Sequence, residues 1–449
     1  MLVACCASVA VAQDAAPPAL DYAQAQQRLE QVSDALAASD AAVRNKQDLQ
    51  DATAWLRLPE ITGEVRRMDF QKSLYVPLGP LEPVARDYGI DDDELVLKYA
   101  DWRTRPTVTA VMPLYTGGLI PAAQRAAAAA TEQASAERED QRQTLQVQLV
   151  QAYFGQRLAQ QAVQVRREVR DGLQQHLDDA NKLEREGFAT RAQVLQATVA
   201  RDKAERDYQK SVNDLSTLQA ALSTLLRSGG SVRPLSPLFV SSTPLGAVEQ
   251  FEQRAQGQHP QVLRLRALEA QAEQGVQAKL AALKPQVFLF GQYDLRRRDE
   301  LLNDPDWAFG IGLKYTFLSP TARPLQVSAA RAQLDQARSG VLEAQNQVSL
   351  GVRKAWNELE TARHQYLLLD SSIAETRENL RVQDLAFREG QATSLDVIDA
   401  RLRLGGAQVE RAQAAYQYDV ALAQLLEMSG QMDRYDEFRR RADQVIDDE

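Results

Sequence analysis

Two carboxylates in the last quarter of the chain come nearest to a functional cluster. Asp396 and Asp399 lie three positions apart, so in a helix they share one face. If copies of the chain met around a symmetry axis, both carboxylates of each copy would join one acidic ring. In the alternative interpretation, Asp396 complements the positive end of a helix dipole and Asp399 is merely solvated.

The other reactive residue types give little support for catalysis. The chain contains no His-Glu-x-x-His pattern, phosphate loop or nucleophile elbow. Both cysteines, Cys5 and Cys6, lie in the leader described below, so a chain beginning at Gln13 has no thiol for a disulfide or a metal site. We therefore expect neither an enzyme nor a metal or cofactor site. The three histidines, which are far apart in sequence, are His176, His259 and His364.

Charge and hydropathy limit the partners. The formal net charge is −9 and no basic stripe stands out, which disfavours nucleic acid. No apolar run reaches the roughly 18 residues that a transmembrane helix needs. If the chain crosses a bilayer, it must therefore do so as β-strands.

The N-terminal segment has the pattern of an export signal. Residues 1–12 form a small apolar run that ends in Ala10-Val11-Ala12, which predicts cleavage before Gln13. The usual basic start of such a signal is missing, which suggests that translation begins further upstream. Alternatively, Leu2-Val3-Ala4-Cys5 fits a lipoprotein cleavage box, which would place a lipid on Cys5.

The chain is an internal repeat. Residues 185–197 and 388–400 are identical at seven of thirteen positions, at a constant offset of 203. Between the repeats lies a stretch rich in Gly, Ser and Pro, which is typical of a linker. The predicted divisions are a first repeat at 20–227, a linker at 228–246, a second repeat at 247–429 and a charged tail at 430–449.

Within each repeat the apolar periodicity changes from two to about 3.6, which indicates strands followed by helices. In the clearest strand, large apolar residues alternate with small or polar ones. The first strand slips phase at Arg66-Arg67, which we interpret as a β-bulge. The segment from Leu74 to Arg105, with Asp91-Asp92-Asp93-Glu94, is expected to be an enlarged external loop. The strands are expected at about 59–71, 106–116, 285–295 and 306–317.

Very long helices follow the second strand of each repeat. The first would run for 68 residues, or roughly 100 Å at 1.5 Å per residue. Gly187 and Gly390 suit the left-handed position after a helix. Thr190 and Thr393 suit the N-cap of the next helix, with an acceptor three residues on. Each repeat therefore ends in a helical hairpin tip, and the long helices are expected at 118–185, 190–227, 320–388 and 393–429.

Four strands of this length could cross a bilayer, but an open sheet would leave two unpaired edges in lipid at several kcal/mol per group. Three chains would close the edges into a twelve-stranded barrel that is wide enough for passage. We therefore expect a homotrimer. The predicted lipid-facing residues are Trp307, Phe309, Ile311, Leu313, Tyr315 and Phe317.

With this duplicated order of helix, strands and helices, the chain resembles the outer membrane efflux protein family, the TolC-like outer membrane factors, over about residues 20 to 428. The resembling motifs are the junction at 113–118, the tips at 186–190 and 389–393, and Asp396-Val397-Ile398-Asp399-Ala400. The resemblance implies a mainly α fold with β-strands. In it, duplicated coiled-coil hairpins form an α-helical tunnel below a trimeric twelve-stranded transmembrane barrel.

The resemblance also implies a function and partners. It implies a passive exit duct in the bacterial outer membrane that extends into the periplasm and serves drug or metal efflux or type I secretion. An inner-membrane transporter and a periplasmic adaptor would be its partners. The alternative is a coiled-coil scaffold without a pore, whose strands form a soluble head.

Carried over residue by residue, the resemblance predicts a pore constriction formed by Asp396, Asp399 and Phe387. The tip residues would dock the adaptor. In well-known relatives an ionic latch joins the two tips, but the aligned residues here are Ala392 and Gln193, so closure is expected to rest on packing. The predicted docking residues are Gly187, Thr190, Gly390 and Thr393.

Overall fold

The computed structural model describes residues 18–89, 94–296 and 306–446, without the side chains of 70, 72, 99, 101 and 103. The expected signal peptide, the Cys5 lipidation site and Asp91-Asp92-Asp93 lie outside the described residues. The chain divides into two compact units. The first comprises residues 1–43, 132–266 and 339–449, and the second comprises residues 44–131 and 267–338.

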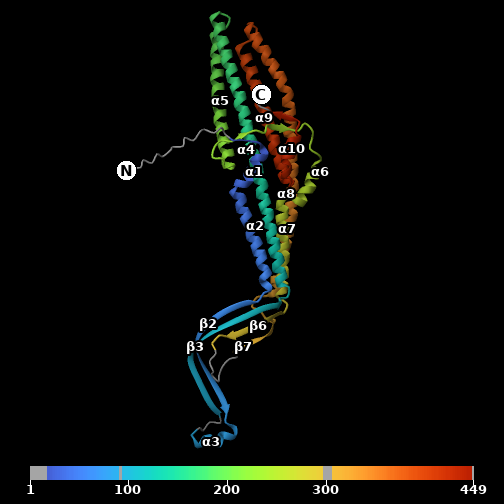
Figure 1. Ribbon diagram of the computed structural model, residues 1–449. Helices are drawn as coiled ribbons and strands as arrows, with labels where there is room; N and C mark the ends of the chain where they lie inside the picture. Colours follow the sequence, from blue (N-terminus) through green and yellow to red (C-terminus); the bar gives the residue numbers. More distant parts are fainter. Residues whose placement is uncertain (1–17, 90–93, 297–305, 447–449) are drawn as a thin grey trace, which may run out of the picture. The chain divides into compact units, whose positions relative to one another are not determined.

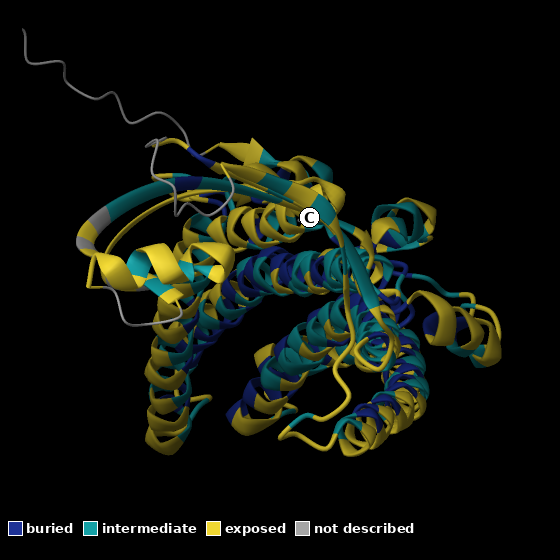
Figure 2. Ribbon diagram, turned by 90° about the horizontal axis from the view of Figure 1, so that it is seen from below, coloured by how far each residue is buried: buried dark blue, intermediate teal, exposed yellow. Residues whose placement is uncertain are grey.

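Four long helices confirm the predicted duplication. The helices α4 (Leu119–Arg185) and α8 (Arg323–Arg388) have 67 and 66 residues, so each is roughly 100 Å long. The helices α5 (Arg191–Leu225) and α9 (Ser394–Met428) have 35 residues each and begin and end at the offset of 203. In Figure 2 many of the helices carry dark blue buried stretches on one side and yellow exposed ones on another, as amphipathic helices do.

Shorter helices precede the strands in each repeat. Each repeat begins with two such helices in succession, α1 and α2 in the first repeat and α6 and α7 in the second. A further short helix, α10, follows α9. No helix within the described ranges combines the length and the apolar character that a membrane span requires. These helices are α1 (Tyr22–Val32), α2 (Asp34–Ala52), α6 (Val248–Gln258), α7 (Pro260–Ala281) and α10 (Tyr435–Arg441).

An aromatic cluster forms the core of the first unit. Tyr22, Phe154 and Tyr435 are fully buried, and their ring centroids lie 5.0 to 6.3 Å apart. The hydroxyl of Tyr153 accepts hydrogen bonds from the backbone N–H groups of two linker residues and donates one to the Leu20 carbonyl at 2.8 Å. The chain start, helix α4 and the linker are thereby tied together.

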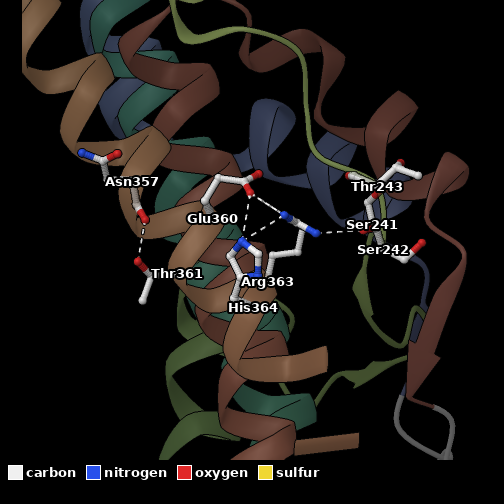
Figure 3. A network of polar contacts seen from close by, with 8 residues as sticks. All are labelled: Ser241, Ser242, Thr243, Asn357, Glu360, Thr361, Arg363 and His364. Carbon is white, nitrogen blue, oxygen red and sulfur yellow. Dashed lines mark hydrogen bonds and ion pairs between the residues drawn. The ribbon is translucent and has the colours of Figure 1, made fainter. Parts of the chain in front are cut away.

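The expected linker is a packed part of the fold. Its strand β4 (Arg233–Pro234) pairs with β1 (Ala19–Leu20), and its buried strand β5 (Leu238–Val240) pairs with β8 (Gln444–Ile446). Beyond β5 the linker contacts helix α8 (Figure 3), where the buried Arg363 donates to the Ser242 carbonyl at 2.9 Å and pairs with Glu360 at 2.6 Å. Because its backbone groups are used in this way, the connection is fixed in place.

The second unit holds one antiparallel four-stranded sheet in the order β2-β3-β6-β7 (Figure 1). Its strands are β2 (Glu60–Pro77), β3 (Glu94–Tyr115), β6 (Gln286–Asp294) and β7 (Trp307–Lys314). The outer edges of β2 and β7 have no partner strand within the described part of this chain.

Two expectations about this sheet were wrong. The ladder of β2 and β3 runs without a register shift from Glu60–Val111 to Pro77–Glu94, so Arg66-Arg67 forms no bulge. Much of the segment from Leu74 to Arg105 is not a loop, because both strands extend into it and α3 (Glu82–Asp87) lies at its far end (Figure 1). The phase slip in the sequence instead marks the point where most apolar residues change from one side of the ladder to the other.

Two aspartates of the first unit, Asp419 and Asp443, should affect the stability of the fold in opposite ways. Asp419 of α9 is fully buried and neither carboxylate oxygen has a hydrogen-bond partner. Burial raises its pKa well above the usual range, although the backbone of Phe239 acts against the rise. Asp443 accepts hydrogen bonds from the hydroxyl and backbone N–H of Ser242, which lower its pKa to about 2.

When the pKa of a carboxyl is higher in the folded than in the unfolded protein, its protonated form stabilises the fold. This stabilisation is lost as the pH rises above the pKa of the unfolded state, about 3.9. We expect Asp419→Asn, which mimics the protonated acid, to raise the melting temperature at pH 8 but hardly at pH 4. Asp443→Asn should lower it at pH 8, since a depressed pKa stabilises above about 3.9. Thermal unfolding at both pH values tests this, and equal shifts of Asp419→Asn at the two values would contradict it.

Candidate functional site

The two hairpin tips have the predicted local structure. Gly187 and Gly390 have φ angles of +82° and +73°, the left-handed region that favours glycine. Thr190 begins α5 and Thr393 begins α9 as N-caps, each in a capping box with the residue three positions on. The glycine lets the chain reverse sharply, and the capping box satisfies N–H groups at the start of the helix that follows.

The predicted constriction acids lie on the exposed side of the second tip. The carboxylate of Asp396 accepts hydrogen bonds from the hydroxyl and the backbone N–H of Thr393, at 2.6 and 2.8 Å. These bonds hold the pKa of Asp396 below its usual range. Asp399 pairs with Arg403 at 2.7 Å, with both side chains more than half exposed. Within one chain, Asp396 therefore has the helix-capping role of the alternative interpretation.

Phe387, the third predicted constriction residue, is buried between the hairpins of the single chain. Its ring centroid lies 4.6 Å from that of His176, and a small apolar cluster that includes Val194 and Val397 surrounds it. The buried His176 Nε2 shares a hydrogen bond of 2.8 Å with the hydroxyl of Ser394, and burial lowers the pKa of this histidine. Phe387 therefore packs the two hairpins together.

An ion pair joins the two hairpins at positions other than those of the family's latch. Ala392 and Gln193 form no ion pair, because neither side chain carries a charge. Arg388 of the second hairpin, however, lies 3.7 Å from Asp179 of the first. Sequence comparison of the repeats gave no sign of this pair, since the two residues meet only through the tertiary packing of α4 and α8.

A cleft of about 350 Å³ separates the tips. The exposed side chain of Phe188 stands at its rim, on the first tip. Gly390 and Ala392 line it from the second tip, whereas Gly187 and the two threonines lie outside it. The further lining residues are Leu183, Glu186, Ala189, Gln193, Phe387, Arg388 and Glu389.

The sheet of the second unit has two chemically different faces. The register places Trp307, Phe309, Ile311 and Leu313 opposite Tyr293, Gly291, Leu289 and Val287 on one face. Phe309 and Leu313 are 76% and 70% exposed, so this apolar face is uncovered in the single chain. Tyr315 and Phe317 are exposed as well but lie beyond the end of β7.

The opposite face carries small and polar residues with two aromatic rings. Phe288 and Phe290 pair with Gly312 and Gly310. A Cβ atom at Gly312 would lie 2.4 Å from the Phe288 ring, so the ring occupies the space that glycine leaves. These two aromatic residues interrupt the alternation of large and small residues along β6, because they lie on the small-residue face. Further along this face Arg105 pairs with the buried Asp294 at 2.7 Å.

The described residues contain no cluster of three or more histidine, cysteine or acidic side chains that could hold a metal ion. His176 and His259 are both buried, and burial lowers the pKa of each. His364 lies on the exposed side of α8 beside Glu360 (Figure 3). The three histidines therefore lie on separate elements of the first unit.

Comparisons with known proteins agree with this geometry. Residues 252–431 match the sequence model of the family described as outer membrane efflux protein. The outer membrane efflux protein BepC of Brucella suis biovar 1 (strain 1330) is 27% identical over 320 residues, which is 68% of this chain and 68% of that protein.

Solved structures confirm the fold class. CusC matches with a TM-score of 0.75 at 16% identity, over 91% of this chain and 92% of that chain. VceC of Vibrio cholerae matches at 0.73 and 16%, over 91% and 96%. The open state of MtrE of Neisseria gonorrhoeae matches at 0.70 and 17%, over 92% and 89%. The chain is therefore similar to the outer membrane efflux protein family in the sequence of its second repeat, and it shares the fold of these channels over most of its length.

Proposed function

We propose that this chain is one protomer of a trimeric exit duct in the bacterial outer membrane, a passive conduit for a tripartite efflux system. The observation that carries the proposal is the four-stranded sheet with an exposed apolar face and two unpaired edges. Such edges are costly in lipid unless neighbouring chains complete them. The name of the Brucella relative, an efflux protein, favours efflux over type I secretion.

The helical hairpins suit the periplasmic part of such a duct. Four long amphipathic helices per chain would form a tunnel wall when three chains assemble. A periplasmic adaptor coupled to an inner-membrane transporter would dock at the tips. The cleft between the tips and the exposed Phe188 at its rim support this assignment, since an aromatic side chain beside a cleft is a common anchor for a partner helix.

The acids of the second tip would narrow the entrance. Three chains would bring six carboxylates from Asp396 and Asp399 towards the axis, a ring that attracts cations. The capping bonds that lower the pKa of Asp396 would act against mutual repulsion and help to keep the ring charged.

The oligomeric state gives the first test. We expect the protein extracted in mild detergent to have the mass of a trimer, because three copies close twelve strands without an unpaired edge. Native mass spectrometry measures this directly, and a monomer or dimer mass would refute the proposed channel.

The rival function, a coiled-coil scaffold without a pore, predicts a different partitioning. A scaffold would remain in solution when detergent is withdrawn, whereas a protein with the exposed apolar face around Phe309 and Leu313 should aggregate. Sedimentation after detergent removal separates the two, and purification of the bound adaptor would then distinguish efflux from secretion.

A further inference from the structure

The far part of the β2–β3 ladder carries four of its five leucines and valines on the face that is polar near the rest of the sheet. We call residues 66–77 and 94–105 the distal hairpin. Within the described strands they pair only with each other (Figure 1). Because the ladder has no register shift from Glu60 to Pro77, residues two apart stay on one face throughout.

The exposed apolar face of the sheet, which carries Trp307 and Phe309, ends where the distal hairpin begins. Ile61 and Val65, both 69% exposed, share the face of Trp307. The next residue on that face, Arg67, has its guanidinium 5.6 Å from the centre of the Trp102 ring. A tryptophan beside a basic residue is typical of the membrane-water boundary. Beyond this point the same face of β2 continues with Asp69, Gln71 and Ser73, and then with Tyr75, which pairs with Val96.

The opposite face changes in the other direction. Near the sheet it carries Thr62, Glu64 and the ion pair of Arg105 with Asp294. In the distal hairpin it carries two aliphatic cross-strand pairs, Leu74 with Leu97 and Val76 with Leu95. We call these four residues the aliphatic patch. Val76 is 38% and Leu97 is 44% exposed, so nothing in the described part of the chain covers the patch fully.

A hairpin of this kind needs a cover. A two-stranded ladder is marginally stable by itself in water, and it usually gains stability from packing one apolar face against another element. The boundary at Arg67 and Trp102 places the patch outside the hydrocarbon layer. Its face is the continuation of the polar face, which points towards the axis of the proposed barrel and away from lipid.

We propose that the aliphatic patch packs against the same patch of the other two copies of this chain and closes the outer mouth of the channel. The inference rests on the proposed function, since the trimer brings the three patches together. Rotational symmetry presents the same face of every copy to the axis, and the four patch residues are uncharged, with Lys72 the next residue of β2 on that face. Burial of the aliphatic groups then holds the three distal hairpins together.

Cross-linking tests the contact. In purified trimer, Leu97→Cys should form disulfide-linked dimers on mild oxidation, because two of the three thiols at the axis can join. Lys98→Cys is the matched control, since Lys98 is the next residue and pairs with Ser73 on the other face. The parent chain gives the background from Cys5 and Cys6. Equal cross-linking at 97 and 98 would overturn the proposal.

Conductance tests the closure independently. We expect Leu74→Asp with Leu97→Asp to raise the single-channel conductance severalfold, because charge repulsion would separate the three hairpins. Ser73→Asp with Lys98→Asp, a cross-strand pair on the opposite face, should leave it near the parent value. An unchanged conductance of the first variant would refute closure.

The two proposals fail in distinguishable ways. If the parent protein gives neither a trimer nor a channel current, the proposed function fails. If it gives both, and the position-97 variants behave like the position-98 variants, only the closure by the aliphatic patch fails.

Discussion

Replacing Phe309 by lysine is expected to disrupt assembly in lipid bilayers by about 2 to 4 kcal/mol, the cost of a cation at mid-depth on the lipid face of a barrel. Phe309 is 76% exposed in the single chain and lies in the middle of the apolar face of β7. Trimer yield after refolding into vesicles, measured over a urea series, gives the loss.

The neighbouring residues provide matched controls. Ala308→Lys introduces the same charge one residue earlier, on the opposite face, where a channel would supply water, so we expect a much smaller loss. Gly310→Ser should also be mild, because the added Cβ would lie 3.2 Å from the end of the Phe290 ring, which can shift slightly. Losses of equal size for Phe309→Lys and Ala308→Lys would show that the two faces were assigned wrongly.

Neutralising the two tip acids is expected to abolish block by a trivalent cation and to reduce cation preference in planar-bilayer recordings. The reason is the proposed ring of carboxylates from Asp396 and Asp399, which would lose all its charge in the double Asn variant. Because the hairpins are held together by Phe387, His176 and Ser394, the open probability should change less than the selectivity.

The substitution is designed to keep the helix cap. In the first tip the amide of Gln193 accepts a hydrogen bond from the backbone of Thr190 at 2.7 Å, so an asparagine at 396 can serve Thr393 in the same way. Glu378→Gln is the control, since it removes one exposed carboxylate of α8 away from the tip. If block and selectivity persist in the double variant, the carboxylates only cap and solvate their helix.

The sequence alone was sufficient for the features that local chemistry dictates. The identity between 185–197 and 388–400 revealed the duplication, and the structure repeats α5 as α9 at the same offset. The glycines and threonines of the tips also behaved as predicted, because a left-handed turn and a helix N-cap depend on a few neighbouring residues. The alternation from Trp307 onwards identified the exposed apolar face of β7 for the same reason.

Only the tertiary structure decided the features that depend on residues distant in sequence. The pairs of Arg388 with Asp179 and of His176 with Ser394 join helices from different repeats, so no local pattern could announce them. The sequence identified residues 228–246 only as a linker, because its glycines, serines and prolines say nothing about strand partners about 200 residues away. The phase slip at Arg66-Arg67 fits either a bulge or an exchange of faces. Cross-strand register alone separates them, because it fixes which side of the sheet each residue occupies.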